Sequence, residues 1–308
     1  MMRSILLWLS RNKTFKNIVM NWPIVRKAAR RFIAGETIDD AIAMIRDLNA
    51  QGITATLDHL GENVETRDDA IRAADDYIKV LDAIGATGVK SHVSVKLTAL
   101  GLDLGDDFCR ENVARILTKA KEVGTRVRID MESTEYTDRT LAVYRRLRQD
   151  FDNVGIVIQA YLYRSEADIA ALCEEGAHVR LCKGAYQEPP AKAFPKKADV
   201  DASYVRLTKM LLSAKARAAG TRGAIATHDP KMIDAAREFA AQASVPRDEF
   251  EFQMLSGIRR DLQQQLAADG YGVRIYVPYG NEWYPYFMRR LAERPANVWF
   301  MVSNYFRK

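Results

Sequence analysis

The chain of 308 residues is 48% hydrophobic and 28% charged, a balance typical of a globular protein with one large core. No apolar run reaches the roughly 18–20 residues that a membrane-spanning helix needs, and three scattered cysteines exclude a disulfide framework. The net charge of +6 is concentrated at the start of the chain, because residues 1–34 hold eight basic residues and no acidic ones.

The first predicted element is a basic helical arm over residues 1–50. Its first 34 residues interleave lysine and arginine with aromatic residues and leucine, a pattern that fits a helix on an anionic membrane surface. An arm packed on the body of the protein explains the pattern equally well. Nucleic acid is not an expected partner, because the rest of the chain carries 38 basic against 40 acidic residues. We expect a cytoplasmic protein, with peripheral contact to the inner face of the membrane left open.

After the arm, short strand-like runs alternate with longer helical stretches. The runs are 53–60, 92–97, 126–131, 154–161, 178–183, 224–228, 250–255 and 273–277, and helical stretches include 68–84, 106–123, 202–219 and 230–242. This alternation favours parallel strands with helical crossovers, and eight units are the count of a closed barrel. An open doubly wound sheet is the alternative, but no glycine-rich dinucleotide motif follows the first strand. The sequence predicts an α/β fold, a (βα)8 TIM-type barrel over residues 51–308.

Several predicted strands carry polar residues on one face only. One face of the run 126–132 holds Arg126, Arg128, Asp130 and Glu132. Apolar side chains on the other face must meet the helices, so the polar face points into the barrel. Buried charges persist only when they pair with each other or meet a ligand. An ion-pair network near the barrel floor is one reading, and the position of these residues near the carboxyl ends of the strands favours a ligand site.

The sharpest local pattern follows the eighth strand. Tyr286, Arg289, Arg290 and Glu293 are spaced to share one face of a helix. Paired guanidinium groups suit the planar, bidentate recognition of a carboxylate, although a solvated charged face gives the same spacing.

Two further pairs of residues lie near strand ends. Lys96 and Asp130 fall at matching depths, which suits a buried ion pair that shapes a pocket. Arg180 and Lys183 bracket the end of the fifth strand, before the small residues Gly184 and Ala185. The four histidines are dispersed, so no catalytic metal site is expected.

Eight segments in order resemble the proline dehydrogenase family, in its monofunctional bacterial form and in the matching domain of proline utilisation A. They are VSVKLTALG (93–101), RIDMES (128–133), VIQAYLYRS (157–165), VRLCKGAY (179–186), IATHDP (225–230), FEFQMLSGIR (250–259), RIYVPYG (274–280) and YFMRRLAE (286–293). The resemblance implies a distorted (βα)8 barrel with non-covalent FAD. It also implies oxidation of L-proline to 1-pyrroline-5-carboxylate by hydride transfer to FAD, with electrons passed to a membrane quinone, as the first step of proline catabolism.

The resemblance also implies roles by position. Arg289 and Arg290 would bind the substrate carboxylate, and Glu293 would orient one of them. The substrate pocket would further include Lys96, Leu255, Tyr276 and Tyr286. Asp130 and Arg180 would be catalytic, with Asp130 fixing the pocket and Arg180 beside the flavin. The FAD would contact Met131, Gln159, Arg180, Lys183, Gly184, Ala185, Thr227 and His228.

Two positions depart from the family pattern: Gln187 stands where an aromatic residue is frequent, and Asp229 where asparagine is common. Three alternatives remain at this point. The first is the same flavoprotein acting on hydroxyproline or another cyclic imino acid, although Tyr276 favours proline. The second is a Schiff-base aldolase or lyase that uses Lys96 or Lys183. The third is a membrane-surface binding protein on a barrel scaffold.

Overall fold

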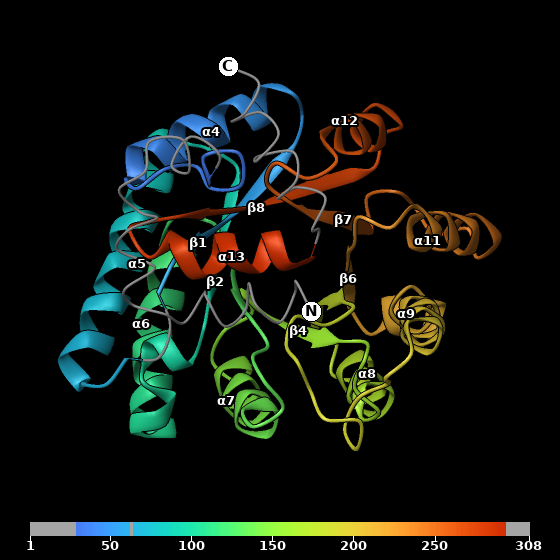
Figure 1. The fold of residues 1–308 in the computed structure, drawn as a ribbon, viewed down its shortest axis with the longest axis horizontal. Helices are drawn as coiled ribbons and strands as arrows, with labels where there is room; N and C mark the ends of the chain where they lie inside the picture. Colours follow the sequence, from blue (N-terminus) through green and yellow to red (C-terminus); the bar gives the residue numbers. More distant parts are fainter. Residues whose placement is uncertain (1–28, 62–63, 294–308) are drawn as a thin grey trace.

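A computed structural model describes residues 29–61 and 64–293, in which eight parallel strands form a closed barrel (Figure 1). The strands, in barrel order, are β1 (Thr54–His59), β2 (Ser91–Val95), β3 (Val127–Ile129), β4 (Val154–Gln159), β5 (His178–Cys182), β6 (Arg222–Ala226), β7 (Phe250–Leu255) and β8 (Gly272–Tyr279). The helices are α4 (Ile38–Ala50), α5 (Arg67–Thr87), η1 (Thr98–Leu100), η2 (Leu102–Leu104), α6 (Asp106–Glu122), α7 (Thr137–Arg148), α8 (Ser165–Glu174), α9 (Lys197–Leu211), α10 (Ala214–Ala218), α11 (Pro230–Gln242), α12 (Arg260–Ala268) and α13 (Trp283–Glu293). The predicted TIM-type barrel is confirmed, with every predicted strand present.

The predicted single helix over 202–219 is wrong, because the chain forms α9 and α10 with a break between them. Ser213 causes the break. Its backbone is extended, with φ −63° and ψ 152°, and its side chain accepts a hydrogen bond from the backbone N–H of Ala216. A serine in this role begins a new helix, since its oxygen satisfies an N–H that has no partner in the first turn.

The local sequence explains why the helices begin and end where they do. Thr66 caps α5 by accepting a hydrogen bond from the Asp69 N–H, and Gly88 ends it at a φ of 66°, a conformation that favours glycine. Asp229 caps α11, and Pro230 occupies the first turn, where its missing N–H costs nothing. Asp229 also pairs with Lys183, as described below.

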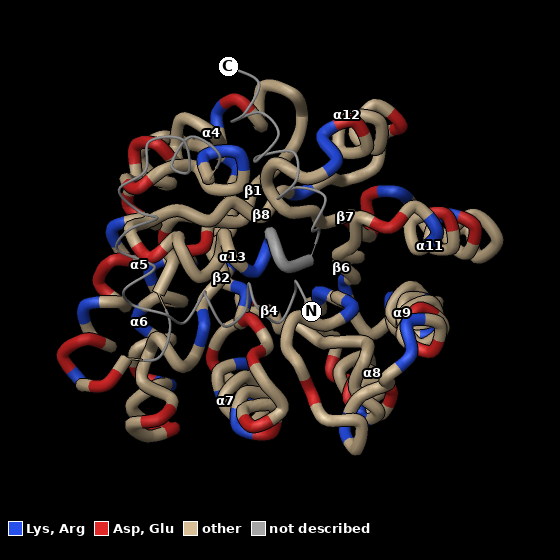
Figure 2. The backbone as a smooth tube through the Cα atoms, viewed as in Figure 1, with Lys and Arg blue, Asp and Glu red and all other residues tan. Residues whose placement is uncertain are grey.

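The main core lies between the strands and the surrounding helices. Outward-facing strand residues such as Leu57, Val93 and Ile129 are fully buried there. Helix α4 packs on β1 and β8 and buries Ala41, Ile42 and Ile45. Residues 1–28, which carry most of the predicted basic arm, lie outside the described residues. Figure 2 shows basic and acidic residues interspersed over the outer helices.

The lower part of the barrel interior holds charges that satisfy one another. Arg274 pairs with Glu251 at 2.9 Å, and Arg128 donates hydrogen bonds to the carbonyls of Ile156 and His178. Gly155 makes room for Arg128, because a Cβ there would lie 2.6 Å from its Nη1. Burial and nearby arginines lower the pKa of His178 to about 3, so it stays neutral. The ion-pair network expected as an alternative therefore exists, but at this level of the barrel.

Candidate active site

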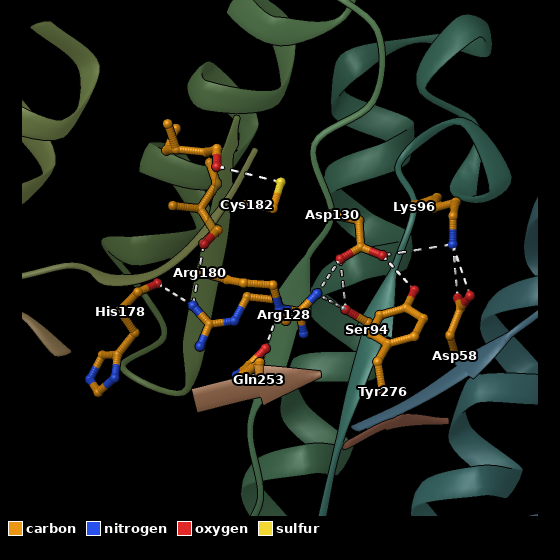
Figure 3. Close-up of polar contacts among 12 residues, drawn as sticks. Asp58, Ser94, Lys96, Arg128, Asp130, His178, Arg180, Cys182, Gln253 and Tyr276 are labelled. Atoms are coloured by element: carbon orange, nitrogen blue, oxygen red, sulfur yellow. Dashed lines mark hydrogen bonds and ion pairs between the residues drawn. The ribbon is translucent and has the colours of Figure 1, made fainter. Parts of the chain in front are cut away.

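Above that layer, Asp130 connects four side chains at the carboxyl ends of the strands (Figure 3). Its Oδ1 accepts hydrogen bonds from Arg180 Nη1 at 2.7 Å and from Ser94 Oγ at 2.8 Å. Its Oδ2 accepts one from the Tyr276 hydroxyl at 2.7 Å and lies 3.7 Å from Lys96 Nζ. These residues come from β2, β3, β5 and β8, so closure of the barrel is what brings them together.

Arg180 crosses the barrel interior and is held on several sides. Its Nε donates to Gln253 Oε1, its Nη1 also reaches Ser94 Oγ at 3.2 Å, and its guanidinium lies 5.2 Å from the centre of the Tyr276 ring. Its Nη2 is buried and has no hydrogen-bond partner in the described part of the chain. A buried N–H of a cation is costly to leave unsatisfied, so this nitrogen is available to a further acceptor.

Lys96 is shared between two carboxylates. Its ammonium group lies 2.9 and 3.1 Å from the two oxygens of Asp58 and is only 8% exposed. Asp58 itself is 1% exposed. Burial, reinforced by repulsion from Asp130, raises the pKa of Asp58 even though Lys96 opposes the rise. For Asp130, burial also acts upward, but Arg180 and Lys96 outweigh it and lower the pKa.

A second polar cluster lies beyond β5. Lys183 Nζ pairs with Asp229 at 2.8 Å and with Asp201 on α9. Asp229, the position that departs from the family pattern, thus provides both a helix cap and a charge partner for Lys183. Both ends of the Gln159 amide are used nearby, since it donates to the Glu132 carbonyl and accepts from the Ala185 N–H, each at 2.9 Å.

Gly184 is required for packing in this cluster. Its φ is 142°, and a Cβ there would lie 2.6 Å from the Tyr161 ring. The Tyr161 ring therefore lies directly against the backbone at Gly184.

We expect Gly184→Ala to lower the free energy of unfolding by about 1–3 kcal/mol, since it adds a clash to backbone strain. Gly124→Ala is the control, because Gly124 also has a positive φ, 71°, but no atom lies within 4 Å of its Cβ position. Urea unfolding of both variants measures the difference. Equal losses would show that the Tyr161 ring yields without cost.

Two of the remaining predicted FAD residues, Thr227 and His228, lie between β6 and α11. His228 Nε2 accepts a hydrogen bond at 2.8 Å from the backbone N–H of Leu255. Its Nδ1 must therefore carry the proton when the ring is neutral. Thr227 is buried, accepts from the Asp229 N–H at 3.1 Å, and donates its own N–H to the Gln253 carbonyl. Met131 is buried in the core next to Asp130.

Comparison with known proteins identifies the family of the chain. The family model described as proline dehydrogenase matches residues 41–303. The chain belongs to the proline dehydrogenase family.

Two curated relatives are similar over most or all of their length. Proline dehydrogenase 1 of Bacillus subtilis is 41% identical over 308 residues, covering 100% of both chains. Proline dehydrogenase of Deinococcus radiodurans is 45% identical over 280 residues, covering 89% of each. Among solved structures, proline utilization A from Bdellovibrio bacteriovorus, inactivated by N-propargylglycine, matches with a TM-score of 0.82 and 26% identity. That match covers 94% of this chain and 38% of the larger protein. A proline dehydrogenase is an oxidoreductase, so this chain is an enzyme of that class.

In this proline dehydrogenase, α13 follows β8 at the mouth of the barrel and projects over its centre in Figure 1. Tyr286 is 6% exposed, and the Arg290 guanidinium lies 5.1 Å from its ring centre. Arg289 and Arg290 are half-buried. Glu293 ends the helix, and its side chain lies outside the described residues. The arginines are thus not a fully solvated charged face.

Of the predicted site residues, the structure joins Lys96, Asp130, Arg180 and Tyr276 directly. Sequence reasoning missed Asp58, Ser94 and Gln253, which complete the hydrogen bonds of this group. A signal for Asp58 was present, because Thr54, Thr56 and Asp58 form the polar face of β1. The same alternation rule that selected Asp130 applies to that strand.

Two predicted absences can be compared with the described residues. Within them, no three His, Cys, Asp or Glu side chains are grouped so that they could hold a metal ion. No helix among them is both long and apolar enough to cross a membrane.

Proposed function

We propose that this chain is an FAD-dependent enzyme that oxidises L-proline to 1-pyrroline-5-carboxylate and passes the electrons to a quinone. The observation that carries the proposal is the buried group around Asp130, with Arg180 fixed inside the barrel and its Nη2 without a hydrogen-bond partner among the described residues. Barrel enzymes place their chemistry at this end of the strands. The reaction would be the first step of proline catabolism.

The side chains present are suitable for holding FAD. The buried Nη2 of Arg180 lacks an acceptor within the described residues. An ammonium group has three donors. Lys183 uses two of them on the carboxylates of Asp201 and Asp229, so one donor is left for a phosphate or carbonyl. Met131, Gln159, Gly184, Ala185, Thr227 and His228 complete the proposed FAD contacts. When bound, FAD supplies a two-electron acceptor for the hydride that leaves the proline carbon beside nitrogen.

The protein contributes orientation and electrostatics. Arg289 and Arg290 would hold the substrate carboxylate by planar, bidentate contacts, with Lys96 on the other side of the pocket. Leu255, Tyr276 and Tyr286 would pack on the ring and keep water from it. Asp130 fixes both Arg180 and Tyr276, so the cation and the ring wall cannot shift independently.

Two observations favour this function over the alternatives. Tyr276 is anchored through its hydroxyl to Asp130 at 2.7 Å, so its ring cannot move aside to accept a ring hydroxyl, which favours proline over hydroxyproline. A Schiff-base lyase needs an amine that is free to attack a carbonyl, whereas Lys96 and Lys183 are each held in ion pairs with two carboxylates.

We expect purified protein to be yellow and to lose its flavin absorbance when proline is added without oxygen. The measurement is a spectrum before and after anaerobic proline, with hydroxyproline as the comparison. A colourless protein that reacts with borohydride and a carbonyl substrate would support the lyase instead.

The acceptor and the location are further parts of the proposal. Reoxidation by a soluble quinone under anaerobic conditions tests the acceptor. Co-sedimentation with anionic liposomes, before and after deletion of residues 1–34, tests whether a cytoplasmic enzyme binds the inner face of the membrane through its basic arm. Lipid binding without any proline oxidation would favour a membrane-surface binding protein.

A further inference from the structure

Asp58 is a buried acid in the centre of the site for which the proposed reaction has no role so far. It stands at the end of β1, 1% exposed, with its oxygens 2.9 and 3.1 Å from Lys96 Nζ. A protonated carboxyl group would not offer both oxygens equally to an ammonium group, so this contact fits an ionised pair. Burying two charges is costly unless they pair at close range and their remaining hydrogen-bonding groups are satisfied.

The surroundings of Lys96 show what Asp58 competes with. Asp130 on β3 lies 3.7 Å from the ammonium group and already receives hydrogen bonds from Arg180, Ser94 and Tyr276. His59, beside Asp58 on β1, Tyr77 on α5 and Tyr276 on β8 also interact electrostatically with Lys96. Lys96 therefore stands between two acids, of which Asp58 is the nearer.

We propose that Asp58 is a positioning residue that keeps Lys96 charged and away from Asp130, so that each of the two acids serves one cation. This inference rests on the proposed function, in which Lys96 contacts the substrate carboxylate. Asp58 holds Lys96, while Asp130 is left to fix Arg180 and Tyr276.

The physical reason is competition for Asp130 Oδ2. That oxygen accepts from the Tyr276 hydroxyl at 2.7 Å, and the Lys96 ammonium group is only 3.7 Å away. Without a negative charge at position 58, attraction draws Lys96 toward Asp130 and weakens the bond to Tyr276. The buried ammonium group also loses the nearer of these two acids, so it gives up its proton at a lower pH.

The test is Asp58→Asn, which keeps the shape and one acceptor oxygen but removes the charge. We expect about a tenfold higher KM for proline near neutral pH, with a smaller change in kcat. We also expect the alkaline loss of binding to begin about one pH unit lower than in the wild type. Cyclopentanecarboxylate, a five-membered ring with the carboxylate but no nitrogen to oxidise, provides a calorimetric Kd over the same pH range that is independent of turnover.

Two further variants separate positioning from folding. Asp58→Glu keeps the charge, so its binding should be lost at the same alkaline pH as that of the wild type. Asp76→Asn is the control, because Asp76 lies nearby on α5 but pairs with Lys79 at the surface. It should leave the KM for proline and the pH dependence of analogue binding unchanged. If Asp58→Asn loses binding at the same alkaline pH as the wild type, the proposal is overturned, even if KM rises.

If Asp58→Asn does not fold, the double variant Asp58→Asn/Lys96→Gln decides the matter, because it removes both charges. A double variant equal to Lys96→Gln alone supports the proposal, since Asp58 then acts only through Lys96. A further loss beyond Lys96→Gln overturns it. Failure of the proposed function is distinguishable, because then the wild type itself neither oxidises proline nor binds the analogue.

Discussion

Replacing Asp130 by asparagine is expected to lower kcat/KM for proline by about 10²–10³-fold. Asparagine has the same shape, but it removes the charge that faces both Arg180 and Lys96. Removing one member of a buried ion pair costs about 3–5 kcal/mol, because the remaining cation is left uncompensated. Arg180 is 6% exposed, so water cannot replace the lost carboxylate. Steady-state kinetics with a dye acceptor, together with the thermal unfolding temperature, measure both consequences.

Asp103→Asn is a suitable control for this variant. Asp103 also accepts a hydrogen bond from a tyrosine hydroxyl, that of Tyr136 at 3.1 Å, and also pairs with an arginine, but at the surface. Exposed pairs contribute little, about 0–1 kcal/mol, so kcat/KM should stay within twofold of the wild type. If Asp130→Asn behaved like this control, the role of Asp130 in fixing Arg180 would be wrong.

The pKa directions in the site predict how it responds to acid. The pKa of Asp130 is lowered by Arg180 and Lys96 against the effect of burial, whereas burial raises that of Asp58. As pH falls, Asp58 therefore takes up a proton before Asp130 does. The stability that the ionised Asp130 provides is present above the usual pKa of an aspartate and is lost as pH falls through its lowered value. Loss of the Lys96 contact should thus precede loss of the Arg180 contact on acidification.

The barrel was predictable because its signal is repeated along the chain. Eight short apolar runs, each followed by a helical stretch, leave few topologies open, and local signals such as Asp229-Pro230 fix a helix start to the residue. The break between α9 and α10 was missed because its cause is a single hydroxyl, that of Ser213, within a continuous helical pattern. Such a cap is visible in sequence but cannot be distinguished from an ordinary serine in a helix.

The site was predictable only in part, for a geometric reason. Alternation along a strand tells which side chains point into the barrel, so Asp130 and Arg180 could be selected. It does not tell which residues meet across the barrel. Tyr276 and Asp130 are 146 positions apart, and Arg180 and Gln253 are 73 apart, so their contacts depend on the register of the strands between them. Asp58 is a different case, because it lies on the strand next to that of Lys96 and the polar face of β1 already marks it in the sequence.

Replacing Arg290 or Arg289 by methionine is expected to raise KM for proline about 100-fold while flavin content stays at the wild-type level. A bidentate contact between a guanidinium and a carboxylate is charge-assisted, and its loss costs about 2–3 kcal/mol, which corresponds to this factor. Methionine keeps the length and apolar body of the side chain, so the packing of α13 is retained. None of the proposed FAD contacts is on α13, which is why cofactor binding should be unaffected.

Arg206→Met provides the matched control, since Arg206 is a helix arginine on α9 that pairs with Glu166 at the surface. It should leave KM unchanged. The comparison separates a specific contact with the carboxylate from a general effect of net charge, because all three variants lose one positive charge. Equal KM values in Arg289→Met, Arg290→Met and the control would refute the arginine clamp. A rise in KM confined to the two α13 variants would instead locate the substrate carboxylate under that helix, opposite Lys96.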